Sequence, residues 1–439
     1  MTDPASQAVG GRAVHVILDL NFDPFPYRGG WILGLVLVMA GLAVLAARYL
    51  AARGGGAAPR SWLQVVGGGL CAGGLVWVLC SLPVLVDAAA AVAGRLADAE
   101  TAAGRPTAAV DVPIPARPGR AAFAVRVTYP VGTRGGPGLL GDLDPEGGVA
   151  PVIVNLPGNG LSRMTNDSTA RFLASRGYVV MAIDDIDNDP PTEPGPAIPP
   201  LHFNYATWSE TLQTMHVADD KAQRQAARAL EALDGVFSRL SPEARARMQL
   251  QQVAMWGFSF GGATAAQSAL MDRRVAAVAD EDGSLFGASA RGESPVPFLS
   301  LWSYEPMDAS QLSSPNPAVR DYALEAAADH HLLRGLLQRP EHYGYILHGP
   351  VHESFSDLIF SRRFLTNLLV VSPYRVRSER RAYLLAFFDR YLRGRPAPLL
   401  ERTPSPFANV QALKQDAGWA AAVDAVPVTA AERRLLRPN

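Results

Sequence analysis

The sequence predicts an α/β fold in which a mostly parallel sheet is covered by helices on both faces, preceded by two transmembrane helices. Strand-like apolar runs alternate with helix-like segments, and the strands are continuously apolar, which is typical of a parallel sheet buried on both faces. Two long apolar runs near the N-terminus predict the membrane part. With 439 residues, the chain is long enough for one large domain and an appendage.

The composition excludes several classes of function. The formal net charge is −1, and the sequence has no basic block that would bind nucleic acid. Cys71 and Cys80 are the only cysteines, so the remainder of the chain can form neither a disulfide framework nor a cysteine metal site. Histidine occurs in no metal-binding pattern such as H-E-x-x-H. We therefore expect no metal, no cofactor and no nucleic-acid partner. Arginine replaces lysine almost throughout, and Lys221 and Lys414 are the only lysines.

Two apolar runs follow an N-terminal tail over residues 1–30. Residues 31–50 contain one charge, Arg48, and residues 61–86 contain none. Each run is long enough to cross about 30 Å of hydrocarbon as a helix. Glycines in both runs would let two membrane helices pack closely. The sequence therefore predicts a transmembrane hairpin over residues 31–86.

The charges beside these runs predict the orientation of the hairpin. The connection carries arginines and no acidic residue, whereas basic and acidic residues are mixed after the second run. By the positive-inside tendency, the connection faces the cytoplasm. The sequence thus predicts a multi-pass protein of the cell membrane with an extracytoplasmic C-terminal part.

The C-terminal part is predicted to contain one globular domain. Residues 87–121 are rich in Ala, Pro, Gly and Arg, which is typical of a linker. The domain is expected over residues 122–395, followed by an extension over residues 396–439. Strands are expected at 123–129, 152–156, 178–183, 253–257, 275–279, 296–302 and 343–347, and helices at 166–176, 208–240 and 377–392. Reactive groups in such a sheet gather at the carboxyl ends of the strands.

The most informative motif lies between Val253 and Ala266. An apolar strand runs through G-x-S-x-G, at residues 257–261, into a small-residue helix. In a nucleophile elbow the serine occupies a strained strand-to-helix turn, and the glycines leave room for a crowded backbone. The N–H groups at the start of the following helix stabilise anionic charge at the same point. Ser259 is therefore the candidate nucleophile.

A serine hydroxyl needs a histidine to accept its proton and a carboxylate to orient that histidine. The expected chain order is serine, acid, histidine. Asp282 follows the next strand and is the candidate acid, and His352 follows the last strand and is the candidate base. The rival acids are Asp280, Glu281, Glu305 and Asp308, and the main rival base is His348. Five further histidines are expected to be structural, namely His202, His216, His330, His331 and His342.

An oxyanion hole is expected from two backbone N–H groups. One belongs to Phe260, directly after the nucleophile. The other is expected in the Gly-rich turn at residues 157–160, where glycines allow the backbone to approach a substrate closely. Asn159 is the candidate donor in that turn, through its backbone N–H.

Taken together, these segments resemble the platelet-activating-factor acetylhydrolase family of α/β-hydrolases. Residues 123–130 look like the family's R-x-x-Y-P entry strand, and residues 174–184 match its A-S-x-G-Y-V-V-x-x-I-D run. Further similarities are the oxyanion loop at residues 156–163, the G-x-S-F-G-G elbow at 257–262, the acid turn at 282–283 and the H-x-x-F-x-D turn at 352–357. The resemblance covers about residues 122–393.

The resemblance implies an α/β-hydrolase fold with Ser259, Asp282 and His352 as nucleophile, acid and base. Two positions differ from the family. Pro157 stands where the family's oxyanion loop has a histidine, which removes a polar neighbour. Ser284 stands where an aromatic residue often follows the acid turn, which affects the shape of the acyl pocket.

The sequence therefore predicts a membrane-anchored serine ester hydrolase of the acetylhydrolase or lipase type, acting through an acyl-enzyme. Lipid-like esters are expected substrates because the predicted hairpin holds the site near a bilayer, and short acyl esters or polyesters fit the chemistry equally well. The alternative is a catalytically silent α/β-hydrolase fold that serves as a binding or scaffold protein at the membrane.

Overall fold

The computed structural model describes residues 30–53, 66–75, 98–118, 120–132, 137–144, 148–188, 201–292, 294–303, 309–361 and 373–436. The chain divides into two compact units. The first comprises Met1–Leu96 and Phe360–Leu369, and the second comprises Ala97–Ile359 and Val370–Asn439.

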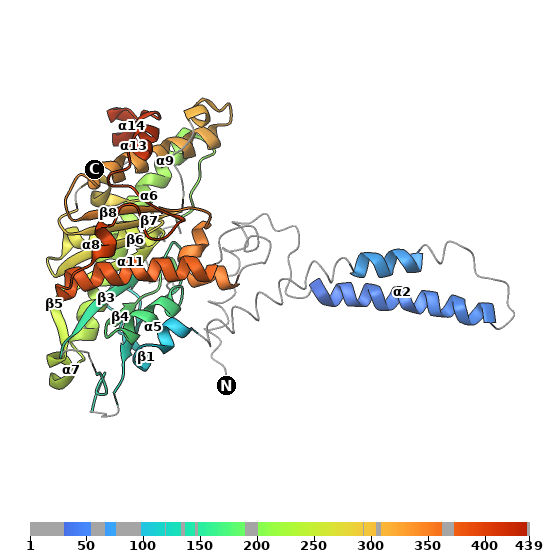
Figure 1. Ribbon diagram of the computed structural model, residues 1–439, viewed down its shortest axis with the longest axis horizontal. Helices are drawn as coiled ribbons and strands as arrows, with labels where there is room; N and C mark the ends of the chain where they lie inside the picture. The colour runs from blue at the N-terminus through green and yellow to red at the C-terminus, as the bar shows by residue number, and fades with distance from the viewer. Residues whose placement is uncertain are drawn as a thin grey trace. The chain divides into compact units, whose positions relative to one another are not determined.

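In the first unit, helix α2 (Gly30–Arg53) packs against a helix at residues 66–75 (Figure 1). The two helices approach closely at Gly41, where an added Cβ would lie 2.7 Å from the carbonyl oxygen of Gly67. The same Cβ would lie 2.5 Å from the Sγ atom of Cys71. A glycine is required at this crossing because any side chain would push the helices apart.

The structure does not support the transmembrane hairpin predicted over residues 31–86. In the part of the chain that the structure describes, no helix is both long enough and apolar enough to cross a membrane. Within the second predicted span, the structure describes residues 66–75, which are helical. Residues 54–65 and 76–86 lie outside the described residues. The predicted multi-pass location and extracytoplasmic orientation lose their support with the hairpin.

The second unit is built on a sheet with nine strands in its described residues, in the order β1-β2-β4-β3-β5-β6-β7-β8-β9. The strands are β1 (Thr107–Ile114), β2 (Phe123–Pro130), β3 (Ala150–Leu156), β4 (Val179–Ala182), β5 (Met248–Phe258), β6 (Val275–Glu281), β7 (Phe298–Trp302), β8 (His342–Leu347) and β9 (Val410–Ala412). From β4 to β8 all neighbours are parallel, while β1, β2 and β9 are antiparallel at the two edges. This confirms the predicted mostly parallel sheet.

Helices cover both faces of the sheet, as predicted. Successive residues of a strand point to opposite faces, and β3 shows the result. Val152 and Val154 join the core formed with α6 and α8, whereas Ile153 joins the core formed with α5 and α11. In Figure 1, α11 crosses one face of the sheet. These helices are α5 (Asp167–Ser175), α6 (Trp208–Phe237), α8 (Phe260–Met271) and α11 (Pro373–Arg393).

The remaining helices lie around the sheet and near the C-terminus. They are α4 (Ala99–Ala102), α7 (Pro242–Ala246), α9 (Pro317–Leu336), α12 (Pro398–Glu401), α13 (Ala417–Asp424) and α14 (Ala430–Leu436). Capping residues set where the longer helices begin. The Thr207 hydroxyl accepts from the N–H of Glu210 at the start of α6, and the Asn316 side chain accepts from the N–H of Ala318 at the start of α9.

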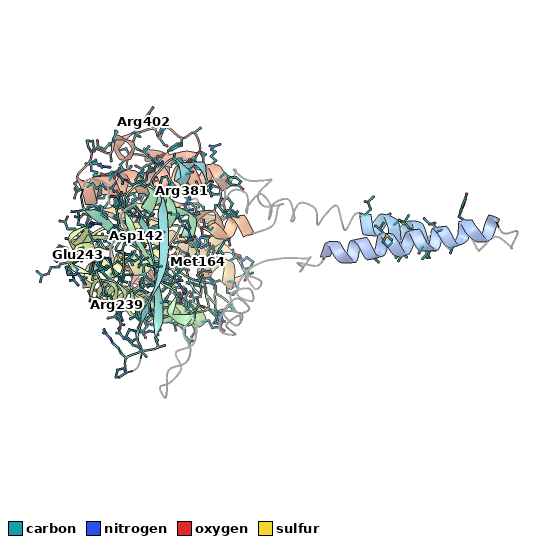
Figure 2. The ribbon with its side chains drawn as sticks, turned by 90° about the horizontal axis from the view of Figure 1, so that it is seen from below. Asp142, Met164, Arg239, Glu243, Arg381 and Arg402 are labelled. Carbon is teal, nitrogen blue, oxygen red and sulfur yellow. The ribbon has the colours of Figure 1, made fainter. Side chains whose placement is uncertain are left out.

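Residues 87–121 are not only a linker, because they contain α4 and β1. Strand β1 pairs with β2 along its whole length, from Thr107 opposite Pro130 to Ile114 opposite Phe123. Close by, Arg381 of α11, which is labelled in Figure 2, donates to the carboxylate of Asp98 at 2.8 Å. From Ala97 onward this segment therefore belongs to the second unit.

The extension over residues 396–439 also packs into the second unit. Strand β9 pairs antiparallel with β8. From α13, Trp419 and Val423 join a core cluster with Trp302 of β7 and Ile346 of β8. The extension thus completes the edge of the sheet that lies farthest from β1.

The burial of His342 in β8 leads us to expect that the protein loses stability in acid. Its ring is 4% exposed, and burial, helped by the charges of Arg339 and Lys414, lowers its pKa from 6.5 to about 4. A histidine whose pKa is lower in the folded state than in the unfolded state contributes stability at pH values above the unfolded-state pKa. This stability is lost as the pH falls from 6.5 through 4. The difference corresponds to about 3 kcal/mol.

We expect His342→Leu to flatten the dependence of the unfolding free energy on pH between 6.5 and 4, measured by urea denaturation at a series of pH values. The control is His216→Leu, because His216 lies on the exposed side of α6. An unchanged slope in His342→Leu would contradict the assignment.

Candidate active site

Ser259 lies between β5 and α8, at the strand-to-helix turn that the motif predicts. Its backbone has φ 55° and ψ −127°, which is strained for a residue other than glycine. A Cβ on Gly257 would lie 2.0 Å from the carbonyl carbon of Gly261, and a Cβ on Gly261 would lie 2.2 Å from the carbonyl oxygen of Leu156. Both glycines of the motif are therefore required by the close approach of β3, β5 and α8.

The structure brings Ser259, His352 and Asp282 into one chain of hydrogen bonds. His352 Nε2 lies 2.9 Å from Ser259 Oγ, and His352 Nδ1 lies 2.7 Å from Asp282 Oδ2. A carboxylate only accepts hydrogen bonds, so Nδ1 carries the proton and Nε2 is left to accept from the serine hydroxyl. The His352 side chain is 45% exposed and that of Asp282 is 1% exposed, so the imidazole is accessible while its partner is shielded.

Ser303, directly after β7, is a residue that the sequence did not reveal. Its N–H donates to Asp282 Oδ1 at 2.5 Å, and its hydroxyl donates to Asp282 Oδ2 at 2.7 Å. These two hydrogen bonds fix the orientation of the Asp282 carboxylate toward His352. The position of Ser303 at the carboxyl end of the strand next to β6 is the one signal in the sequence that could have indicated it.

The rival acids of the same turn have other contacts. Asp280 is 1% exposed and accepts from the Ser300 hydroxyl at 3.4 Å. Burial, together with the nearby charge of Asp282, raises the pKa of Asp280 well above its usual range. Asp280 also faces α8, since a Cβ on Gly262 would lie 1.8 Å from its Oδ1 atom. None of these contacts involves His352.

Glu281 forms a buried ion pair with Arg380 of α11. Two hydrogen bonds of 2.8 Å and 2.7 Å join the groups, and both side chains are at most 1% exposed. Arg380 Nη1 also donates to the carbonyl oxygen of Ser354 at 3.1 Å, in the short helix η4 (His352–Phe355). Because Glu281 precedes Asp282, the pair connects the turn of the aspartate with the turn of the histidine.

Three further rivals were Glu305, Asp308 and His348. Glu305 and Asp308 lie outside the described residues. His348 is exposed at the end of β8, and its backbone N–H donates to the carbonyl oxygen of Asn409 at 2.8 Å.

The two predicted oxyanion donors lie beside Ser259. Phe260 is the first residue of α8, so its N–H lacks a partner within that helix by position. A Cβ on Gly158 would lie 3.2 Å from the Cβ of Ser259, and Asn159 follows Gly158 directly. The Asn159 side chain donates to the carbonyl oxygen of Leu201 at 2.9 Å.

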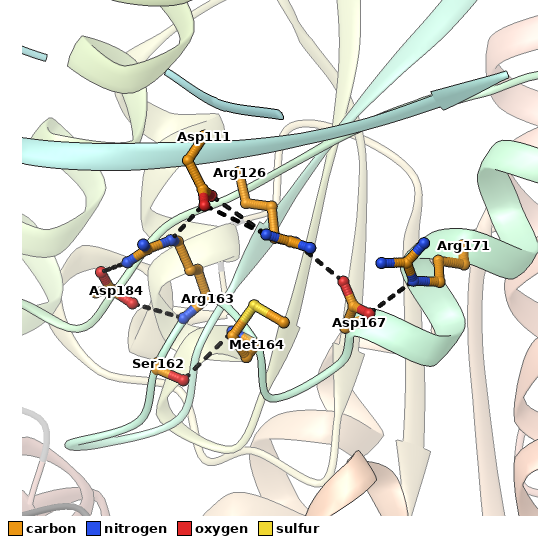
Figure 3. Close-up of polar contacts among 8 residues, drawn as sticks. All are labelled: Asp111, Arg126, Ser162, Arg163, Met164, Asp167, Arg171 and Asp184. Carbon is orange, nitrogen blue, oxygen red and sulfur yellow. Dashed lines mark hydrogen bonds and ion pairs between the residues drawn. The ribbon is translucent and has the colours of Figure 1, made fainter. Parts of the chain in front are cut away.

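A network of charged residues holds the far side of this loop (Figure 3). The backbone N–H of Arg163 donates to Asp184 at 2.7 Å, and its guanidinium donates to Asp184 at 2.5 Å and to Asp111 of β1 at 3.3 Å. Arg126 of β2 bridges Asp111 at 3.3 Å and Asp167 of α5 at 3.1 Å. The loop after β3 is thereby tied to β1, β2 and α5.

No metal site accompanies these residues in the described ranges, where no group of three or more His, Cys, Asp or Glu side chains could hold a metal ion.

The fold and this arrangement define a class of protein: an α/β protein with a mostly parallel sheet and an elbow serine at the carboxyl ends of its strands. No family model and no curated protein matches the chain. Among solved structures, the chain is similar to a ferulic acid esterase from Streptomyces cinnamoneus, with a TM-score of 0.49 and 23% identity over 70% of this chain and 95% of that chain. This likeness concerns the fold. The resemblance to the platelet-activating-factor acetylhydrolase family stays a prediction from the sequence.

Arg380→Met should destabilise the protein by about 3–5 kcal/mol. Glu281 would be left as a buried charge without its cationic partner, keeping the hydrogen bond from the Trp256 indole N–H at 2.8 Å. Urea unfolding at pH 7 measures the change. The matched control is Arg390→Met on the same helix, whose ion pair with Glu401 is exposed and should contribute at most about 1 kcal/mol. Equal effects of the two substitutions would contradict the structural role of the buried pair.

Proposed function

We propose that the protein is a serine ester hydrolase that acts through an acyl-enzyme. Ser259 is the nucleophile, His352 the general base and acid, and Asp282 the residue that orients the imidazole. The observation that carries the proposal is the chain of hydrogen bonds of 2.7 Å and 2.9 Å from Asp282 through His352 to Ser259, set on a strained elbow.

The acylation step follows from these contacts. As Ser259 Oγ forms a bond to the ester carbonyl carbon, its proton passes to His352 Nε2. The carbonyl oxygen becomes an oxyanion, which the N–H groups of Phe260 and Asn159 stabilise. The bond to the leaving alkoxide then breaks, and the alkoxide takes the proton from His352 and departs as an alcohol. The acyl group remains on Ser259 as an ester.

Deacylation repeats the sequence with water. His352 removes a proton from a water molecule, whose oxygen attacks the acyl carbon. The second oxyanion collapses, the bond to Ser259 Oγ breaks, and His352 returns the proton to the serine. The buried Asp282 carboxylate stabilises the imidazolium in both steps. The products are an alcohol and a carboxylic acid.

The proposed substrates are carboxylic esters. The argument for lipid-like esters depended on a membrane hairpin that the structure does not support, so it no longer favours them over short acyl esters. A series of p-nitrophenyl esters of increasing acyl length is the direct way to measure the preference.

Ser259→Ala should abolish ester hydrolysis and labelling by a fluorophosphonate probe, while the thermal unfolding temperature stays close to that of the wild type. A loss of about a thousandfold or more is expected for a triad nucleophile. The control is Ser209→Ala, an exposed serine at the start of α6. Turnover retained by folded Ser259→Ala would refute the mechanism, and a wild type that neither hydrolyses esters nor takes the label would favour the silent binding protein.

A further inference from the structure

Lys221 of α6 is a buried cation beside the proposed site. It is 1% exposed and is one of two lysines in a chain whose Lys and Arg residues number 40. Its Nζ atom lies 2.9 Å from Asp185, 2.5 Å from Asp187 and 2.5 Å from Asn159 Oδ1. An ammonium has three N–H donors, so these three oxygens use all of them.

Lys221 contacts both residues proposed to stabilise the oxyanion. It donates to the side chain of Asn159, and its Nζ lies 5.2 Å from the centre of the Phe260 ring. A cation at this distance over an aromatic face is attracted to it. One buried side chain thus contacts the side chains of both residues whose N–H groups are the proposed oxyanion donors.

The contacts of Asn159 close into a ring of hydrogen bonds. Lys221 donates to Asn159 Oδ1, and Asn159 Nδ2 donates to the carbonyl oxygen of Leu201 at 2.9 Å. The N–H of Leu201 donates to Asp187 Oδ2 at 3.0 Å, and Asp187 accepts from Lys221. A closed ring fixes the Asn159 side chain at both of its polar atoms.

The turn around Asn159 is rich in glycine. Gly158 and Gly160 flank Asn159, and Gly160 has a φ of 67°, a conformation that glycine adopts freely. The Asn159 side chain anchors the middle of this turn, while Asn188 Nδ2 donates to the carbonyl oxygens of Gly160 at 3.3 Å and Leu161 at 3.0 Å on its far side. The anchor of Asn159 in turn is Lys221, which α6 and the two aspartates hold in place.

We propose that Lys221 is a positioning residue for the oxyanion site. Through Asn159 it fixes the backbone turn whose N–H group faces the developing oxyanion, and its charge offsets the carboxylates of Asp185 and Asp187 beside that turn. The inference rests on the proposed function. Because the oxyanion forms only in the transition state, Lys221 acts on kcat and not on substrate binding.

The test compares Lys221→Met, Asn159→Ala and the double variant in the full-length protein with a short p-nitrophenyl ester. We expect each single variant to lower kcat by about 10–100-fold, less than the loss of an oxyanion donor itself, with KM changed by less than about twofold. The double variant should lose no more than the worse single variant, because both changes break one connection. Affinity for a trifluoromethyl ketone, which forms a tetrahedral adduct, should fall in step with kcat.

The matched control is Lys414→Met, which should leave kcat unchanged. Lys414 donates to the backbone carbonyl oxygens of Arg339, Pro340 and His342, at the amino end of β8 and so at the opposite edge of the sheet from Ser259. If Lys221→Met does not fold, the kcat of Asn159→Ala alone tests the connection between Lys221 and the turn, because this variant leaves both ion pairs of the lysine intact.

The outcomes separate this inference from the proposed function. A wild-type enzyme without turnover, or Ser259→Ala with turnover, contradicts the proposed function. A wild-type enzyme with Ser259-dependent turnover whose kcat is unaffected by Asn159→Ala overturns only the role of Lys221. Additive losses in the double variant, or a change confined to KM, overturn it as well.

Discussion

The close approach of β3, β5 and α8 around Ser259 is the constraint on which the site depends. A Cβ on Gly257 would lie 2.0 Å from the backbone of Gly261, so only glycines let the strand turn directly into the helix. This turn places Ser259 at a positive φ and aligns the start of α8 with its hydroxyl. The strain, on the order of 1–3 kcal/mol, is held by the surrounding core.

The groups that act on Ser259 lie on separate turns, and hydrogen bonds from buried cations hold these turns in place. Arg380 connects the turn of Asp282 with that of His352. Lys221 holds the turn of Asn159. Burying a charged side chain carries a desolvation cost. Here that cost is offset by the several hydrogen bonds that each cation donates. The result is a set of loops whose reactive groups keep fixed separations.

The sequence was sufficient to predict the parallel sheet and the residues that meet at its edge, because continuous apolar strands and a strand-turn-helix motif are local patterns. It was not sufficient for β1, an edge strand in a segment rich in Ala and Pro that pairs with β2 alone. Nor could it decide from local pattern alone whether Asp282 or the adjacent Glu281 orients the histidine. That choice depends on the backbone turn at Asp282, where φ is 59°. Ser303 and Arg380 were missed because their contacts are made across distant parts of the chain. The hairpin predicted from two apolar runs is not supported by the described helices.

The central claim is that Ser259 attacks an ester carbonyl whose oxygen is held by the N–H groups of Phe260 and Asn159. A crystal structure of the protein after reaction with a p-nitrophenyl phosphonate tests this most directly, because the adduct has the tetrahedral geometry of the intermediate. The account predicts phosphorus bonded to Ser259 Oγ, with the phosphoryl oxygen about 2.7–3.1 Å from both nitrogen atoms. Phosphorus on another residue, or a phosphoryl oxygen that points away from both N–H groups, would contradict it.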